Sequence, residues 1–388
     1  MKTKFRWTLC LALLLSLAVT SIADPVAAQA CDPAFVTQTG MVITVKPTSV
    51  DDTANLQCAF DLAVAAGPGR TVRLLTGTYH TGLIFVNNFH GTFTGAGSTK
   101  TVVTNLPDLD VTPEDVIFDL PSPTNRWPDL VSFVEGDFAI SDMAFQIKGD
   151  QPTLPWTIFG IDPPLRVLSA AVLVTGEQVS ARIERVLVEG EPMPETMFGY
   201  NLINGTVYAN YFGGPRITGS LTIKNSIFRN LNSGTPVNSP SGASILITRN
   251  TFENVFYGMD GGEFLNSRFE FSYNQVNAVM GMDLYTAYTS EDAGSEILIK
   301  NNVFRGAIGP AFEQMMGADN KCLFIGNNVQ NVTDIGIYLG PATNGCTVVG
   351  GSSKTNVLDL GTDNVLVGVN SMGSGVGPVI HPFIRLWK

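Results

Sequence analysis

Five segments between positions 221 and 332 share one pattern, and this repeat constrains the fold more than any other feature of the chain. Each segment carries alternating apolar residues, a polar corner residue and a further apolar pair. The segments are LTIKNSIFRNL (221–231), ILITRNTFENV (245–255), FEFSYNQVNAV (269–279), ILIKNNVFRGA (297–307) and CLFIGNNVQNV (322–332). The corners are Ser226, Asn250, Asn274, Asn302 and Asn327, which are 24, 24, 28 and 25 residues apart. A repeat of this length is typical of solenoids, in which each unit forms one coil.

The alternation within each segment indicates β-strands, because apolar residues recur at every second position and not at every third and fourth. One set of side chains is therefore expected to point into a core: Ile223, Ile247, Phe271, Ile299 and Phe324. A single coil cannot bury its apolar face, so neighbouring coils must stack and share one core. The corner asparagines are then expected to form a ladder at the ~4.8 Å strand spacing. The sequence predicts an all-β fold, a single-stranded right-handed parallel β-helix.

The N-terminus has the layout of a secretory signal peptide. Basic residues within the first six positions precede an apolar run and small residues, and cleavage is expected after Ala23 or Ala30. The protein is therefore expected to be secreted or periplasmic. Cleavage after Ala30 would place Cys31 first, but the preceding residues lack the leucine of a lipobox, so lipid anchoring at Cys31 is the less favoured alternative. No later run reaches the ~18 apolar residues that a transmembrane segment needs.

The charge of the chain excludes one class of partner. The net charge is −11 and only 15% of the residues are charged, whereas nucleic-acid binding requires a dense basic patch. Nucleic acid is therefore not expected as a partner.

Residues 51–79 combine a short amphipathic helix, a strand and the turn Gly77-Thr78-Tyr79. A helix over the first coil would protect the open end of a solenoid from association. This arrangement resembles the N-terminal cap of the pectin-lyase-like superfamily, and GTFTGAGSTKTVV (91–103) resembles the coil that follows it. With the asparagine-cornered repeats, the resemblance covers most of residues 45–370. It implies a right-handed parallel β-helix, a scaffold that carries many unrelated functions.

The predicted organisation has four parts and three insertions. The parts are a signal peptide (1–30), the N-terminal cap and first coil (31–80), the parallel β-helix (81–370) and a C-terminal closure (371–388). The insertions span 106–129, 150–165 and 191–216. Insertions in a solenoid form loops that often gather at a binding face.

Four cysteines follow the signal peptide. Cys322 and Cys346 occupy the same inward position one coil apart, so their α-carbons are expected to lie ~5 Å apart, within disulfide range. An oxidising compartment favours that bond, and two buried thiols packed as small apolar residues are the alternative. Cys31 and Cys58 are expected to fasten the start of the chain to the cap.

After each corner the chain is expected to make a short strand and a turn, and the strand that begins the next coil carries acidic residues in one outward row. Met259 and Met282 are expected to face the core, which leaves Asp260, Asp283, Glu313 and Tyr338 pointing outward. In the pectin-lyase-like superfamily this sheet forms the substrate groove, so the candidate catalytic residues are Asp260, Asp283 and Glu313. The candidate substrate-binding residues are Tyr257, Tyr285, Tyr338, Arg268 and Lys321.

Ionising all of the stacked carboxylates is unfavourable because like charges repel at this distance, and three interpretations remain open. In the first, one acid keeps a proton and protonates a leaving oxygen while its neighbour acts as base or nucleophile, as in glycoside hydrolases. In the second, Ca²⁺ lies between the carboxylates and supports a lyase or epimerase reaction on a uronate. In the third, the row is an exposed acidic stripe that keeps the sheet soluble.

The signatures of the individual enzyme families are absent or incomplete. The chain has no Arg-x-Pro-x-x-Arg of pectate lyases and neither the Gly-His-Gly nor the Arg-Ile-Lys of polygalacturonases. The segment 257–260 (Tyr-Gly-Met-Asp) resembles the start of an alginate epimerase motif, but Gly261-Gly262 replaces its Pro-His. Two functions are therefore expected: an exported polysaccharide-active hydrolase, lyase or epimerase, or a non-catalytic secreted or surface-attached β-helix that binds glycans or a partner.

Overall fold

The computed structural model describes residues 31–107, 129–147, 153–154, 165–166, 170–192, 204–209, 216–238, 240–285, 294–305, 312–315, 321–330, 335–341, 343–351 and 356–372. The predicted signal peptide, most of the three predicted insertions and residues 373–388 lie outside these ranges, so the predicted domain boundaries stay predictions. No helix among the described residues combines the length and the apolar character needed to span a membrane.

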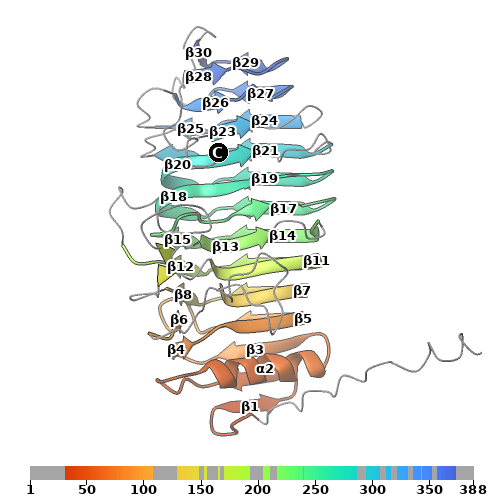
Figure 1. Cartoon of the computed structure of the whole chain (residues 1–388), viewed down its shortest axis with the longest axis vertical. Helices are drawn as coiled ribbons and strands as arrows, with labels where there is room; N and C mark the ends of the chain where they lie inside the picture. The colour runs from red at the N-terminus through yellow and green to blue at the C-terminus, as the bar shows by residue number, and fades with distance from the viewer. Residues whose placement is uncertain are drawn as a thin grey trace, which may run out of the picture. The chain divides into compact units, whose positions relative to one another are not determined.

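Parallel strands of successive coils stack into three faces (Figure 1), and the predicted right-handed parallel β-helix is confirmed. In each coil the chain passes through face 1, then face 2, then a tight corner, then face 3. Five long strands bend from one face to the next: β5 (Ile84–Thr94), β7 (Asp129–Ser141), β11 (Ala170–Glu184), β18 (Thr251–Gly262) and β20 (Gln275–Tyr285).

Face 1 contains the first parts of β5, β7 and β11 and the second parts of β18 and β20. Its other strands are β13 (Asn204–Ala209), β16 (Val237–Asn238), β23 (Phe312–Met315), β26 (Ile337–Leu339), β28 (Asn356–Asp359) and β30 (Asn370–Met372).

Face 2 contains the second parts of β5, β7 and β11. Its other strands are β2 (Val42–Val45), β3 (Arg70–Leu74), β14 (Thr218–Lys224), β17 (Ser244–Thr248), β19 (Arg268–Ser272), β21 (Glu296–Lys300), β24 (Lys321–Ile325), β27 (Cys346–Val349) and β29 (Val365–Val367).

Face 3 contains the first parts of β18 and β20. Its other strands are β4 (Gly77–Thr81), β6 (Thr101–Asn105), β8 (Ala144–Gln146), β12 (Leu187–Glu189), β15 (Ile227–Arg229), β22 (Val303–Arg305) and β25 (Asn328–Val329). Two antiparallel pairs complete the fold: β1 (Val36–Thr39) pairs with β2 at the end of face 2, and β9 (Thr153–Leu154) pairs with β10 (Leu165–Arg166) outside the three faces.

The corner asparagines form the predicted ladder. Asn274 Oδ1 accepts a hydrogen bond from the backbone N–H of Asn250 at 2.9 Å, and Asn302 Oδ1 accepts one from the N–H of Asn274 at 2.8 Å. Each amide also donates to a carbonyl one coil earlier, as Asn274 does to Ile247 O at 3.0 Å. The three asparagines are 1% exposed. The ladder therefore satisfies backbone groups that the corner would otherwise bury without partners.

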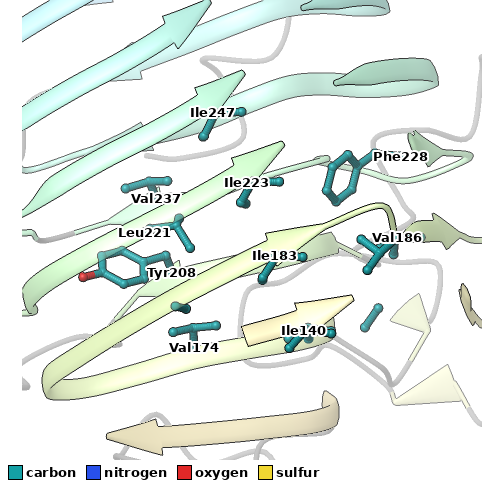
Figure 2. Close-up of a cluster of buried hydrophobic side chains, with 14 of the residues drawn as sticks. Ile140, Val174, Ile183, Val186, Tyr208, Leu221, Ile223, Phe228, Val237 and Ile247 are labelled. Carbon is teal, nitrogen blue, oxygen red and sulfur yellow. The ribbon is translucent and has the colours of Figure 1, made fainter. Parts of the chain in front are cut away.

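The inward side chains form one core along the stack. Ile140, Ile183, Ile223 and Ile247 lie in register on successive strands of face 2 (Figure 2) and are 0–1% exposed. Phenylalanines stack behind face 3, and the ring centroids of Phe228 and Phe252 are 5.2 Å apart. Apolar burial over many coils supplies the main driving force for this fold.

The helix α2 (Thr53–Ala65) covers the first coils, as Figure 1 shows, and packs against β2, β3 and β5. Its Phe60 ring contacts those of Phe93 and Phe133, with centroids 5.0 and 5.7 Å apart. A disulfide joins Cys58 on this helix to Cys31. A sulfur in a disulfide cannot carry a thioether-linked lipid, so this bond and lipid anchoring at Cys31 exclude each other.

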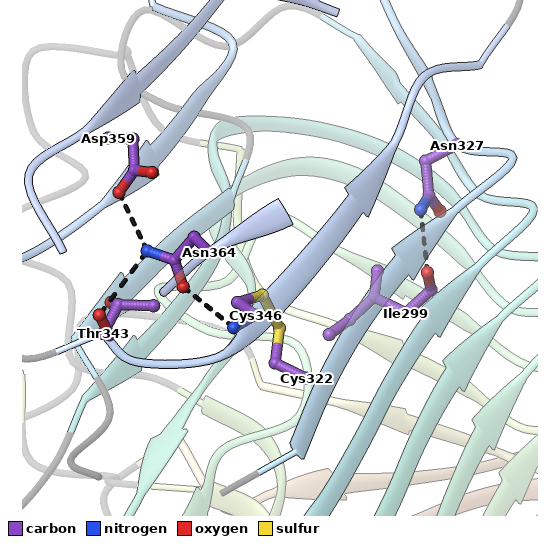
Figure 3. The surroundings of a disulfide bond; sticks show 7 residues. All are labelled: Ile299, Cys322, Asn327, Thr343, Cys346, Asp359 and Asn364. Atoms are coloured by element: carbon purple, nitrogen blue, oxygen red, sulfur yellow. Dashed lines mark hydrogen bonds between the residues drawn. A yellow bond between two sulfur atoms is a disulfide. The ribbon is translucent and has the colours of Figure 1, made fainter. Parts of the chain in front are cut away.

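A second disulfide joins Cys322 to Cys346 (Figure 3), which are register partners on β24 and β27 with α-carbons 4.4 Å apart. Nearby, Asn364 accepts a hydrogen bond from the backbone N–H of Cys346 at 2.8 Å and donates one to Asp359 at 2.8 Å. The C-terminal coils thus keep amide cross-links after the corner ladder has ended.

The ladder predicts a large cost for removing one amide. Asn274→Ala would leave the buried N–H and side-chain amide of Asn250 without their acceptor and remove the bond to Ile247 O, and we expect a loss of about 3 kcal/mol in the free energy of unfolding. Urea unfolding followed by circular dichroism would measure this loss. The matched control is Asn277→Ala, whose side chain is exposed and whose expected effect is within about 0.5 kcal/mol. Equal losses for both variants would contradict the structural role of the ladder.

Candidate functional site

Two aspartates occupy neighbouring rungs of face 1. Asp260 on β18 and Asp283 on β20 are register partners, and the backbone of Glu313 on β23 follows on the next rung. They point outward because Met259 and Met282, one position earlier on each strand, are 0% exposed in the core. Adjacent parallel strands lie ~4.8 Å apart, so the carboxyl groups of the two aspartates are close neighbours.

The row becomes apolar on the N-terminal side of Asp260. In β11 and β13 its outward residues are Leu173 and Val207, register partners that are 0% and 2% exposed. With Ala170 and Ala209 they form a buried apolar cluster separate from the interior core. The sequence carried a sign of this double-sided burial, because AAVLVT (170–175) is a continuous apolar run and not an alternating one.

Burial shifts the acidity of both aspartates. Each side chain is only partly exposed. Desolvation, and then the charge of Asp283, raise the pKa of Asp260 to about 8, and desolvation raises the pKa of Asp283 to about 7. Two such close carboxyls titrate as a pair. Near neutral pH the pair therefore holds at least one proton beside an ionisable neighbour.

One oxygen of the pair lacks a partner. Asp283 Oδ1 is buried and makes no hydrogen bond to the part of the chain that the structure describes. A buried polar atom in this state costs about 1–3 kcal/mol. Its lone pairs are available to a proton, a substrate hydroxyl or a water molecule.

The predicted substrate-binding residues do not all lie beside this pair. Tyr338 is the register partner of Glu313, and Tyr285 follows Asp283 by two positions on the same strand; the side chains of Glu313 and Tyr285 lie outside the described atoms. Tyr257 lies three positions before Asp260, and its ring packs edge-on against that of Phe256, with centroids 4.5 Å apart.

The two predicted cationic residues lie on a different face. Arg268 and Lys321 begin β19 and β24 on face 2, where both are exposed and Glu296 lies between them in register. The register therefore separates them from the carboxyl pair and places a carboxylate between them.

The donor set for calcium is small. Ca²⁺ takes about six to eight oxygen ligands. Within the described residues, no three histidine, cysteine, aspartate or glutamate side chains converge on one point. Asp260 and Asp283 alone do not make a complete calcium site, so a bound Ca²⁺ stays a prediction.

A depression of about 400 Å³ lies where face 1 turns into face 2, beside His90, Asp137 and Ser180. The carboxylate of Glu135 there accepts hydrogen bonds from the backbone N–H groups of Glu177 and Gln178 at 2.6 and 2.8 Å. Because both its oxygens bind the turn of the next coil, Glu135 has a structural role.

The fold and this site define a class: a right-handed parallel β-helix with a carboxyl pair on its first face. No family model matches the sequence, and no curated protein matches it. Among solved structures, the chain is similar to a polygalacturonase from Erwinia carotovora ssp. carotovora, with a TM-score of 0.50, 11% identity and coverage of 89% of this chain and 99% of that one.

Two further similar structures are an enzyme and an adhesin. One is the A-module of a mannuronan C-5 epimerase from Azotobacter vinelandii (TM-score 0.37, 15% identity, 84% and 96% coverage). The other is a surface protein and adhesin of Streptococcus pneumoniae (TM-score 0.41, 14% identity, 85% and 96% coverage). At these identities the likeness shows the fold alone.

The raised pKa values predict that stability depends on pH in a defined direction. Because of the pair, the folded protein binds more protons than the unfolded chain between about pH 4 and pH 8. The contribution of the pair to stability is therefore fully present below about pH 4 and is lost as the pH rises and the pair ionises. From pH 5 to pH 8 we expect a loss on the order of 1–3 kcal/mol attributable to the pair.

The comparison variant is Asp260→Asn with Asp283→Asn, because asparagine is neutral at every pH. Urea unfolding of both proteins at pH 5, 6, 7 and 8 would measure the difference. We expect a flatter profile for the double variant, and parallel profiles would contradict the raised pKa values.

Proposed function

We propose that the chain is an exported polysaccharide-active enzyme that hydrolyses glycosidic bonds at the Asp260–Asp283 pair. The observation that carries the proposal is the pair itself: two register-adjacent, partly buried carboxyls, one of which is protonated near neutral pH. Glycoside hydrolysis requires one carboxylic acid and one carboxylate flanking the same bond. The shared fold with a polygalacturonase supports a polymeric sugar as the substrate.

The environments of the two aspartates suggest their roles. Asp260 keeps its proton to higher pH, so it is the general acid that protonates the leaving oxygen. Asp283, with the unpartnered Oδ1, is the base that takes a proton from water or the nucleophile that attacks the sugar. In the first case water supplies the new hydroxyl on one sugar and Asp260 supplies the proton to the other. In the second, Asp283 bonds to the sugar carbon as the leaving oxygen takes the proton of Asp260, and water then breaks that bond, supplying the hydroxyl and returning a proton to Asp260.

Elimination or epimerisation is the alternative enzymatic reaction, in which Ca²⁺ would hold a uronate. The same aspartates would hold the cation in that case, and the Gly261-Gly262 dipeptide supplies no imidazole to move the proton. A non-catalytic glycan-binding protein is the alternative outside catalysis. Hydrolysis is favoured because the pair itself provides an acid beside a base, so neither a cation nor an imidazole is needed.

The test is turnover of a panel of polyuronates and neutral polysaccharides, measured as new reducing ends. We expect Asp260→Asn and Asp283→Asn to lower kcat at least 100-fold, as removal of a general acid or base commonly does. Asp363→Asn is the matched control, because Asp363 is exposed and far along the chain from the pair. Wild-type protein that binds a polysaccharide but turns over none would reject catalysis and favour the binding protein. Products with the ultraviolet absorbance of an unsaturated uronide would replace hydrolysis with elimination.

A further inference from the structure

Face 3 carries a second surface that the proposed reaction does not use. A depression of about 560 Å³ lies over β18, β20 and β22. Its polar lining residues are Thr251, Glu253, Asn254, Gln275, Asn277 and Arg305. In β18 and β20 the chain bends between this surface and face 1, so the depression and the carboxyl pair lie on different sides of the coil.

The polar side chains stand in two columns that run along the stack. Thr251 and Gln275 are register partners in the first column, and Glu253 and Asn277 are register partners in the second, which continues to Arg305. Hydrogen-bonding groups therefore recur at each rung, ~4.8 Å apart. The alternate residues Phe252 and Val276 are buried, so core packing does not dictate these outward residues.

The middle of the two columns is free to bind. The side chains of Thr251, Glu253, Gln275 and Asn277 make no hydrogen bond to any described residue, and the last three are exposed. The flanking positions differ, because Arg229 pairs with Glu189 at 2.7 Å and Arg305 Nε donates to Gln330 at 3.1 Å. The depression therefore concentrates unused donors and acceptors between positions that are already paired.

Two exposed side chains with apolar surface lie on the adjoining corner and the preceding coil. Tyr273, two residues before Gln275, is 52% exposed, and Ile227, the register partner of Thr251, is 40% exposed. A tyrosine ring offers a rigid apolar face with a polar tip, which suits the C–H face of a sugar ring above it.

The charges on this surface favour a neutral ligand. Glu253 supplies one carboxylate and Arg305 supplies one guanidinium, and the remaining groups are amides and a hydroxyl. Amides donate and accept hydrogen bonds, as sugar hydroxyls do. A polyuronate would meet no excess of positive charge here and would be repelled by the net charge of −11.

We propose that face 3 binds a neutral polysaccharide, which lies along the stack over Gln275 and Asn277 with a sugar ring against Tyr273. The binding does not require Asp260 or Asp283, so it stands or falls separately from the proposed hydrolysis.

Native gel electrophoresis through immobilised polysaccharide tests this binding. The gels would contain hydroxyethylcellulose, xylan, galactomannan or polygalacturonate. We expect at least one neutral polymer to retard the protein, and Tyr273→Ala and Asn277→Ala each to raise its dissociation constant at least fivefold. Tyr273→Phe should keep most of the affinity because the ring face remains.

Two controls separate this surface from the others. Asn87→Ala removes an exposed amide on face 1, and it should bind like the wild type. The Asp260→Asn, Asp283→Asn double variant should also bind, whatever its activity. Lack of retardation by every neutral polymer, retardation by polygalacturonate alone, or unchanged binding by the Tyr273 and Asn277 variants would each overturn the proposal.

Discussion

The hydrogen bonds that cross from coil to coil at the buried corners set the register on which every other feature depends. The residue before each corner is left-handed, as at Arg249, Tyr273 and Asn301, with φ of 57°, 56° and 55°. This conformation turns the chain sharply and costs about 1 kcal/mol or more for a residue other than glycine. The amides of the ladder offset that cost by pairing with backbone groups of the preceding coil and with the asparagine amide of the following coil. A slip of one residue would expose the core and separate Asp260 from Asp283.

Packing in the core also explains part of the Tyr-Gly-Met-Asp segment (257–260), which resembles the start of an alginate epimerase motif. A β-carbon on Gly258 would lie 2.6 Å from Val276 Cγ1, so only glycine fits there. Gly234, its neighbour on the previous coil, is held in the same way by Phe252, whose Cδ1 would lie 2.4 Å from an added β-carbon. In Tyr-Gly-Met-Asp, the glycine and the methionine are thus packing residues, whereas Tyr257 and Asp260 are partly exposed.

Features with a regular period were predictable from the sequence, whereas features set by irregular turns were not. The fold, the inward residues and the asparagine ladder follow from alternation and spacing, which depend only on neighbouring coils. The place of Arg268 and Lys321 at the start of the second strand follows from the alternating runs beside them, but their separation from the carboxyls depends on the turn between face 1 and face 2, which alternation does not encode. The apolar residues Leu173 and Val207 lie in the row of Asp260 two or more rungs away, in coils separated by long insertions, so no constant spacing links them to it. The burial that raises the pKa of the two aspartates became visible only in the three-dimensional structure.

The two outward surfaces differ in how far their polar groups are exposed to water. On face 1 the carboxyls are partly buried, and the loss of water keeps a proton on one of them, which acid catalysis requires. On face 3 the amides are exposed, and hydrogen bonds that replace water there each contribute little, so affinity must come from repetition along several rungs. A long polymer meets that requirement and a monosaccharide does not. If the polymer bound on face 3 is also the substrate, tethering it beside face 1 raises its effective concentration at the aspartates without any new contact to the cleaved bond.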